Sequence, residues 1–255
     1  MAIGIGTPIY DLANLPGQGK SSGGGGGGAP TVDLIDNDYS FKFDSAANSS
    51  IQTNIGNIYN HNDKTLSFSC WFNIPAAIPG TNIFSYLVIW SSNDSPDLTS
   101  GPGANMRLYY AAPGDFKAYL YGYNGPSGGQ SGSYSKPLYY NVWYNIVTVW
   151  TGMNVLGTNR NKVELYIDGE LELTKFNTIS SANNSYLNQP TIGGKYSSYF
   201  NAGAYIDEWA YWENTGLSED DVKLIYDSTN DNPGKTADLS TLSTGAPTAW
   251  YRMGD

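Results

Sequence analysis

The sequence predicts an all-β protein, an antiparallel two-sheet jelly-roll sandwich with one short helix. The first observation behind this prediction is composition: the 255 residues include 21 tyrosines and 30 glycines but only 14% charged residues, a mixture typical of strands and turns. The second is an apolar/polar alternation that recurs along about a dozen short stretches from Thr31 onward. The third is the lack of any repeat of roughly 20 to 50 residues, which excludes a solenoid or a propeller.

Two short regions precede the strands. Residues 1–22 carry only two charged residues and several scattered aliphatic ones, and residues 23–30 begin with six consecutive glycines. A glycine run cannot pack a core and loses much backbone entropy on ordering, so it separates its neighbours. We therefore expect an N-terminal anchoring arm at 1–22, a Gly-rich linker at 23–30 and a jelly-roll domain at 31–255. The alternative for residues 1–22 is a disordered leader.

The first strands show the alternation most clearly. Residues 39–44 alternate aromatic with polar side chains, which predicts a half-buried strand, and residues 65–73 alternate between an apolar and a second face. The apolar face consists of Leu66, Phe68, Cys70 and Phe72, and the second face of Ser67, Ser69 and Trp71. Cys70 is therefore expected to be a small core residue. As the single cysteine, it also excludes an intramolecular disulfide.

The middle of the chain predicts a buried strand, a hairpin and a loop. Residues 83–91 are nearly all apolar, as in a central strand. Residues 106–111 and 116–122 flank an Ala-Pro-Gly-Asp turn and form the predicted hairpin. The Gly/Ser/Asn/Tyr-rich stretch 122–137 is predicted to be a long loop.

A second hairpin follows the predicted apolar strand at 142–151. Residues 162–174 alternate on both sides of Asp168-Gly169, and an Asp-Gly pair between alternating runs is the strongest short-range hairpin signal. The expected core face of this hairpin consists of Val163, Leu165, Ile167, Leu171 and Leu173.

The last predicted elements are two strands and the helix. The strands span residues 191–194 and 203–213. The helix follows Ser218, which is a favoured N-cap residue, and acidic side chains fill its first turn. Its apolar residues predict a length of about nine or ten residues.

Three stretches resemble the laminin-G-like, concanavalin A-like jelly-roll superfamily. They are SFSCWFNIP at 67–75, the pair WYNIVTVWTG at 143–152 and NKVELYIDGELE at 161–172, and the run from TIGGKY to LIYD at 191–227. Their order and spacing match those of that superfamily. The resemblance implies the fold and leaves the function open, since this fold hosts lectins, enzymes and scaffolds.

The two ends of the chain resemble bacteriophage virion proteins, especially those of phages infecting marine bacteria. The similar segments are the glycine-rich start at 1–20 and DLSTLSTGAPTAWYRMGD at 238–255. This resemblance implies a head or tail appendage in the virion, assembled in the bacterial host cytoplasm and held to other virion proteins by residues 1–22. A homo-oligomer is a further expectation, because a sandwich must cover its edge strands; the alternative is that the chain's own loops cover them.

Charge excludes several classes of partner. The net charge is −10 and the pI is near 4.4, so we expect no binding of nucleic acid or of an anionic membrane. The chain begins without a signal-peptide pattern, and it has no unbroken apolar run of roughly 18 residues. The single histidine, His61, excludes a multi-histidine metal centre.

We expect no enzymatic activity. Glycosidases need two carboxyl groups held roughly 5 to 10 Å apart in a cleft. The strand alternation turns Glu170 and Glu172 outward and leaves Asp168 to the turn, so these three acids do not form such a pair. His61 lies in a polar run without a nucleophile and base pattern around it.

We expect no cofactor. The resemblance offers Ca²⁺ as the alternative, because laminin-G-like domains often hold calcium with carboxylate and carbonyl oxygens. Asp44 and Asp207 occupy positions where the resemblance places acidic residues. The alternative is that Asp207 and its neighbour Glu208 are hydrogen-bonded structural carboxylates.

The tyrosine-rich stretch around 119–140 is the predicted ligand-binding region. Its candidate residues are Tyr121, Tyr123, Asn124 and Tyr134. Aromatic faces stack on sugar rings, and amide and hydroxyl groups bond to sugar hydroxyls. The alternative is that these tyrosines cover a sheet or contact a neighbouring subunit. The sequence thus predicts a virion appendage that binds host surface glycans, with a free carbohydrate-binding module as the alternative and a glycoside hydrolase as the third hypothesis.

Overall fold

The computed structural model describes residues 40–42, 50–73, 85–91, 103–112, 115–123, 130–133, 138–139, 141–177, 186–187, 189–193, 205–227 and 237–252. For the strands within 85–133 and for 186–187 it describes the backbone alone. The chain divides into two compact units, Met1–Thr31 and Val32–Asp255. All described residues belong to the second unit, so the predicted arm and linker lie outside them.

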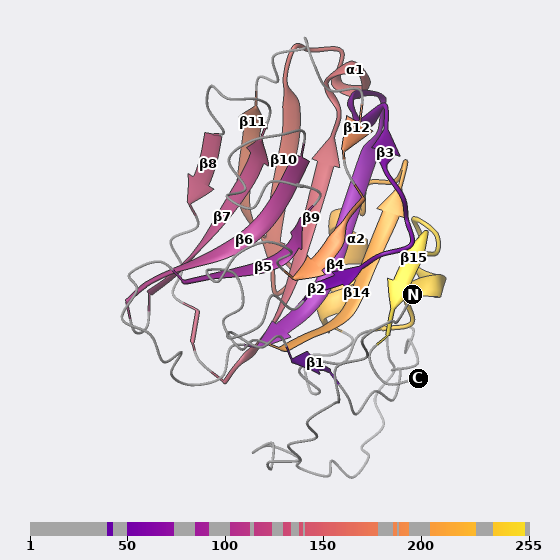
Figure 1. The fold of residues 1–255 in the computed structure, drawn as a ribbon. Helices are drawn as coiled ribbons and strands as arrows, with labels where there is room; N and C mark the ends of the chain where they lie inside the picture. The colour runs from indigo at the N-terminus through magenta and orange to yellow at the C-terminus, as the bar shows by residue number, and fades with distance from the viewer. Residues whose placement is uncertain are drawn as a thin grey trace, which may run out of the picture. The chain divides into compact units, whose positions relative to one another are not determined.

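The described chain is all-β, as predicted, and its strands form two large antiparallel sheets. The seven-stranded sheet has the order β1-β14-β4-β9-β10-β11, with β15 paired to β14. Its strands are β1 (Phe41–Lys42), β4 (Thr65–Asn73), β9 (Trp143–Thr151), β10 (Asn161–Ile167), β11 (Glu170–Asn177), β14 (Tyr205–Glu213) and β15 (Ala249–Tyr251). Figure 1 shows this sheet together with the second sheet, whose strands β5 to β8 are drawn in magenta.

The six-stranded sheet has the order β2-β13-β5-β6-β7-β8. Its strands are β2 (Ser50–Gln52), β5 (Ser85–Ser91), β6 (Gly103–Ala112), β7 (Asp115–Tyr123), β8 (Gln130–Ser133) and β13 (Thr191–Gly193). The remaining elements are β3 (Ile58–Tyr59), which pairs with β12 (Tyr186–Leu187), the helices α1 (Met153–Leu156) and α2 (Glu219–Asp227), and the 3₁₀ turns η1 (His61–Asp63) and η2 (Leu239–Thr241). The sequence predicted α2 and missed the four-residue α1.

An apolar core lies between the two sheets. The face of β4 predicted to be apolar, with Cys70 in it, belongs to this core. Ile192 of β13 is part of the same cluster, and Ile51 of β2 packs against it. The core prediction for Cys70 is therefore confirmed, and burial together with the nearby Asp207 carboxylate raises the pKa of its thiol.

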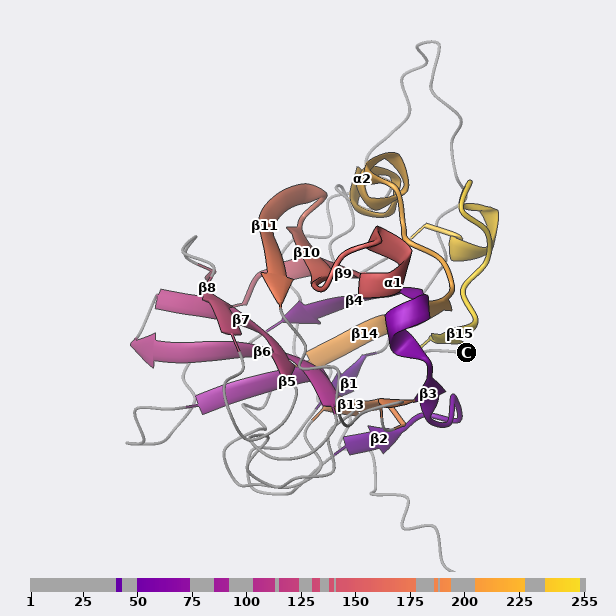
Figure 2. The ribbon, with the colours of Figure 1, turned by 90° about the horizontal axis from the view of Figure 1, so that it is seen from above.

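A second apolar layer covers the outer face of the seven-stranded sheet. Val222 and Ile225 of α2 and Leu239 of η2 pack there against strand residues such as Val147 and Trp212. Figure 2 shows α2 on one side of this sheet and β5, β13 and β2 on the other. β4 is consequently buried on both faces.

The buried outer face of β4 explains its polar and aromatic residues. The ring of Trp71 stacks on Tyr226 of α2 with a centroid distance of 6.1 Å. The hydroxyl of Ser67 donates to the Thr215 carbonyl at 2.9 Å and accepts from the Leu217 amide at 3.0 Å. These contacts attach the segment before α2 to the sheet.

The N-terminus of α2 is capped as the sequence predicts. Ser218 Oγ accepts from the amide of Asp221 at 3.1 Å, and it also donates to the Asp221 carboxylate at 2.9 Å. The same carboxylate accepts from the Ser243 amide at 3.0 Å. Burial raises the pKa of Asp221, but hydrogen bonds from Ser218 and Ser243 outweigh burial, so the net pKa lies below the usual value. One carboxylate therefore links α2 to the C-terminal segment.

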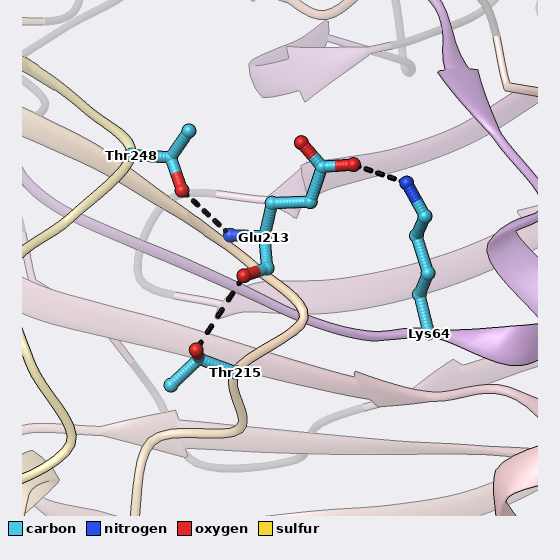
Figure 3. A network of polar contacts seen from close by, with 4 residues as sticks. All are labelled: Lys64, Glu213, Thr215 and Thr248. Atoms are coloured by element: carbon cyan, nitrogen blue, oxygen red, sulfur yellow. Dashed lines mark hydrogen bonds and ion pairs between the residues drawn. The ribbon is translucent and has the colours of Figure 1, made fainter.

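A polar network joins the same C-terminal segment to the sheet (Figure 3). Lys64, just before β4, forms an ion pair with Glu213 at the end of β14. The Glu213 amide donates to Thr248 Oγ at 3.0 Å, and the Thr215 hydroxyl is 3.4 Å from the Glu213 carbonyl. The two side chains are 19% and 31% exposed, and the network connects the start of β4, the end of β14 and the C-terminal segment.

The predicted hairpin of β10 and β11 turns at Asp168 and Gly169, whose φ angles of 52° and 80° belong to the left-handed region. Leu173 packs against the core as predicted. The prediction for Leu171 is wrong: a register shift pairs Leu165 with Leu173 but Tyr166 with Leu171, so Glu172 is the extra residue of a bulge. The bulge moves Leu171 to the outer face, where it is 42% exposed.

Two further predictions need correction. Phe41, expected on a buried face, is 43% exposed in β1, while residues 39 and 43–44 of that stretch lie outside the described residues. The predicted loop 122–137 contains a strand, because β8 pairs with β7. The sequence of β8, Gln-Ser-Gly-Ser, has no apolar alternation, so the sequence did not indicate a strand there. The strand pairs with β7 through the backbone, at the edge of the six-stranded sheet.

Candidate functional site

The candidate ligand-binding tyrosines lie on β7. Tyr121 pairs with Asn105 of β6 on one side and with Ser131 of β8 on the other. Tyr123, two residues further on, pairs with Gly103. The other two candidates, Asn124 and Tyr134, lie outside the described residues.

The register identifies the core face of the six-stranded sheet. Ile192 of β13 is fully buried in the inter-sheet core, and it pairs with Trp90 of β5. Trp90 pairs with Met106, and Met106 pairs with Leu120. Directly paired residues of an antiparallel sheet share a face, so these positions belong to the core face.

The remaining alternate positions make up the opposite face, which we call the polar face. Residues two apart on a strand share a side, and the register joins the strands laterally. The polar face includes Tyr86, Asn105, Arg107, Tyr109, Lys117, Tyr119, Tyr121, Tyr123, Ser131 and Ser133. It is thus rich in tyrosine and in uncharged hydrogen-bonding residues, whereas the core face carries Leu, Met and Trp.

The structure adds residues that the sequence analysis did not assign to the site. Arg107 pairs with Tyr119, and Tyr109 pairs with Lys117 and with Tyr86 of β5. The alternation that indicates a polar strand face was present in the sequence, since Asn, Arg and Tyr alternate with Met and Leu over residues 105–109. The sequence could not show which strands lie beside β7, because that depends on the register.

Of the two candidate calcium ligands, the structure describes only Asp207. Asp44 lies outside the described residues. Asp207 is buried in β14, where its Oδ1 accepts from the Glu208 amide at 2.7 Å. Glu208 has a φ of 50° at a bulge, and its Oε2 accepts from the Trp250 indole at 2.5 Å. No group of three or more His, Cys, Asp or Glu side chains suited to a metal occurs among the residues that the structure describes.

The three acidic residues of the β10–β11 hairpin, Asp168, Glu170 and Glu172, lie in different environments. The Asp168 carboxylate accepts from the Asn145 amide at 2.9 Å, while the Asp168 amide donates to the Asn145 carbonyl at the same distance. Glu170 is exposed and Glu172 lies in the bulge. Asp168 is therefore part of the turn, as predicted.

His61 is buried and packs edge-on against Trp150, with ring centroids 6.1 Å apart. Within the described part of the chain neither ring nitrogen has a hydrogen-bond partner. Burial lowers the pKa of His61 to about 4, although the Asp63 carboxylate acts in the opposite direction. The imidazole is consequently neutral at pH 7.

Comparison with known proteins gives the family. Residues 39–223 match the family model described as the Concanavalin A-like lectin/glucanases superfamily. A search of curated proteins finds no match. Over the ranges that the structure describes, no helix has the length and apolar character needed to cross a membrane.

Solved structures are similar in fold. The binding domain of botulinum neurotoxin serotype D has 18% identity and a TM-score of 0.51, with 77% of this chain and 44% of that chain covered. The binding domain of Paraclostridial Mosquitocidal Protein 1 has 17% identity and a TM-score of 0.51, with 78% and 46% covered. The heptameric SAP-like pentraxin of Limulus polyphemus has 12% identity, a TM-score of 0.48 and coverage of 77% and 80%. The chain thus spans less than half the length of the two toxin domains, and the likeness to these two domains concerns the fold alone.

Proposed function

Since the chain belongs to the concanavalin A-like lectin/glucanases superfamily, we propose that it is a glycan-binding domain without enzymatic activity, and that the polar face holds the ligand. One observation carries this proposal. The register sets Tyr119, Tyr121 and Tyr123 in a row on β7, with Asn105 and Ser131 paired to the middle one. Alternate positions of a strand are about 7 Å apart, so the row extends over about 14 Å.

Such a row suits a sugar chain. A tyrosine ring offers a flat apolar surface to the carbon–hydrogen face of a sugar and a hydroxyl for a hydrogen bond. Asparagine and serine donate to and accept from sugar hydroxyls. Binding surfaces that combine rigid tyrosines with small polar residues adapt to polar ligands at a low cost in conformational entropy.

A glycan array tests the binding. The full chain should bind at least one class of immobilised oligosaccharide, and Tyr121→Ala should weaken that binding by about tenfold or more, since one stacked ring and its hydroxyl are lost. Tyr59→Ala is the matched control, because Tyr59 is 57% exposed on β3, outside the six-stranded sheet. Equal binding by the Tyr121 and Tyr59 variants contradicts the proposed site, and release of reducing sugar in the presence of Ca²⁺ contradicts a purely binding role.

The proposal extends to a bacteriophage particle. The domain would be a head or tail appendage that is anchored to other virion proteins through residues 1–22. Its polar face would bind host glycans. Support comes from the similarity of the chain's two ends to virion proteins and from the run of six glycines that follows residues 1–22. The alternative is a free carbohydrate-binding module.

Co-sedimentation with phage particles that lack the protein separates these two alternatives. The full chain should pellet with the particles, and a chain that starts at Ala29 should stay in solution, because only the former contains the arm. If both chains stay in solution while binding glycan-coated beads, the protein is a free module.

A further inference from the structure

The charges on the polar face indicate which glycans it would select. The whole chain has net charge −10 and three arginines, and one of them, Arg107, stands on the central strand of the polar face. On β6 its neighbours on the same face are Asn105 and Tyr109, and across the strands it pairs with Val88 and Tyr119. Around Arg107 the described strands therefore place no acidic residue next to it.

A second cation strengthens this pattern. Lys117 pairs with Tyr109 and shares the polar face with Arg107. Asp115 is two residues before Lys117 on β7, so it shares the polar face with Lys117. It is the first residue of β7, at the hairpin turn. Arg107 thus lies among the tyrosine positions in the middle of the polar face, and Asp115 lies at the edge of that face.

An arginine whose described register partners are not acidic is suited to an anionic ligand. The guanidinium presents a planar set of donors that matches a carboxylate with two parallel hydrogen bonds. In a chain that is otherwise acidic, a local positive charge also favours an acidic ligand over other surfaces.

We propose that the polar face is selective for carboxylated glycans, those containing uronic or sialic acid residues, and that Arg107 binds the sugar carboxylate. The inference rests on the proposed glycan-binding function and names its ligand class. The tyrosines of β7 bind the sugar rings, and Arg107 provides the discrimination between acidic and neutral sugars.

The experiment uses the full chain on matched pairs of glycans. Uronic and sialic acid oligosaccharides are immobilised beside the same oligosaccharides after their carboxyl groups have been reduced to alcohols. The acidic member of a pair should bind at least about tenfold more tightly, and binding should weaken as salt is raised. Arg107→Gln should abolish the preference, and Arg107→Lys should retain only part of it, because lysine keeps the charge but loses the planar donor set.

A control variant separates local from global charge. Arg160→Gln removes the same charge at an exposed turn before β10, in the other sheet, so it should leave the preference unchanged. Equal binding of acidic and reduced glycans, or an unchanged preference in Arg107→Gln, overturns the inference while the glycan-binding function stands. Tight binding of sulfated glycans alone also overturns it. If no glycan binds at all, the proposed function fails and this inference fails with it.

Discussion

The buried imidazole of His61 links the stability of the domain to pH. Its pKa is about 4 in the folded protein, against about 6.5 in an unfolded chain. The unfolded state therefore takes up the proton first, and stability falls as the pH decreases from about 6.5 toward 4. His61 and Trp150 pack against each other, so protonation also places a charge beside an indole in the core.

We predict that lowering the pH from 8 to 5 costs the protein about 2 kcal/mol of unfolding free energy through His61 alone. Denaturant unfolding at several pH values, followed by tryptophan fluorescence, measures this loss. His61→Phe keeps an aromatic ring and removes the titration, so its stability should fall by about 2 kcal/mol less over the same range. Parallel pH profiles for the two proteins would contradict the prediction.

At the scale of elements, the turn between β10 and β11 requires glycine at position 169 for two reasons, its backbone conformation and its close approach to α2. Its φ is 80°, a conformation that costs an L-residue roughly 1 to 2 kcal/mol. A Cβ there would also lie 3.3 Å from two side-chain atoms of Tyr226 in α2. The hairpin turn thus lies directly against the helix that covers the outer face of the sheet.

Gly169→Ala should therefore destabilise the protein by more than backbone strain alone, by about 2 to 3 kcal/mol. Gly157→Ala is the matched control, because Gly157 has a φ of 63° and a Cβ added there would meet nothing within 4 Å. That variant should lose only the strain. Equal losses measured by chemical denaturation would mean that α2 moves away from the turn at no cost.

Sequence alone predicted the elements whose signal is local. The β4 strand with Cys70 at its core, the Asp168-Gly169 turn and the Ser218 cap follow from residues that are neighbours in the chain. Leu171 could not be placed correctly, since the bulge at Glu172 depends on pairing with β10. The second apolar layer was also missed, because alternation in β4 does not show that a distant helix covers Trp71.

The candidate site was predicted in part for the same reason. Tyrosine and glycine near 119–140 pointed to β7, and Tyr121 and Tyr123 are on its polar face by register. Arg107 entered the site only through its pairing with Tyr119. A residue on a neighbouring strand has no fixed sequence spacing from its partner, so single-sequence reasoning does not identify it.

At the scale of the whole molecule, the two ends of the chain differ in their relation to the fold. Residues 23–28 are six consecutive glycines, a run that separates its neighbours, so removal of residues 1–28 should change the thermal midpoint by no more than about 2 °C. Differential scanning calorimetry of the full and shortened chains checks this expectation. A larger decrease would mean that the arm contributes to the folded domain.

The opposite truncation is the control. Removing residues 237–255 deletes β15, which pairs with β14, and takes Leu239 and Leu242 out of the outer apolar layer. Several kcal/mol of burial are lost with these side chains, which is comparable with the whole stability of a domain. This shortened chain should fail to give a cooperative unfolding transition.

The strand order of the seven-stranded sheet also bears on protein synthesis. Leu66 of β4 pairs with Glu213 of β14, roughly 150 residues later in the chain, so β4 leaves the ribosome long before this partner exists. Until then the outer face of β4 also lacks α2, which follows β14 in the chain. The nascent chain therefore leaves the outer face of β4, with Trp71, uncovered during translation, and we expect slow expression or chaperones to raise the yield of folded protein.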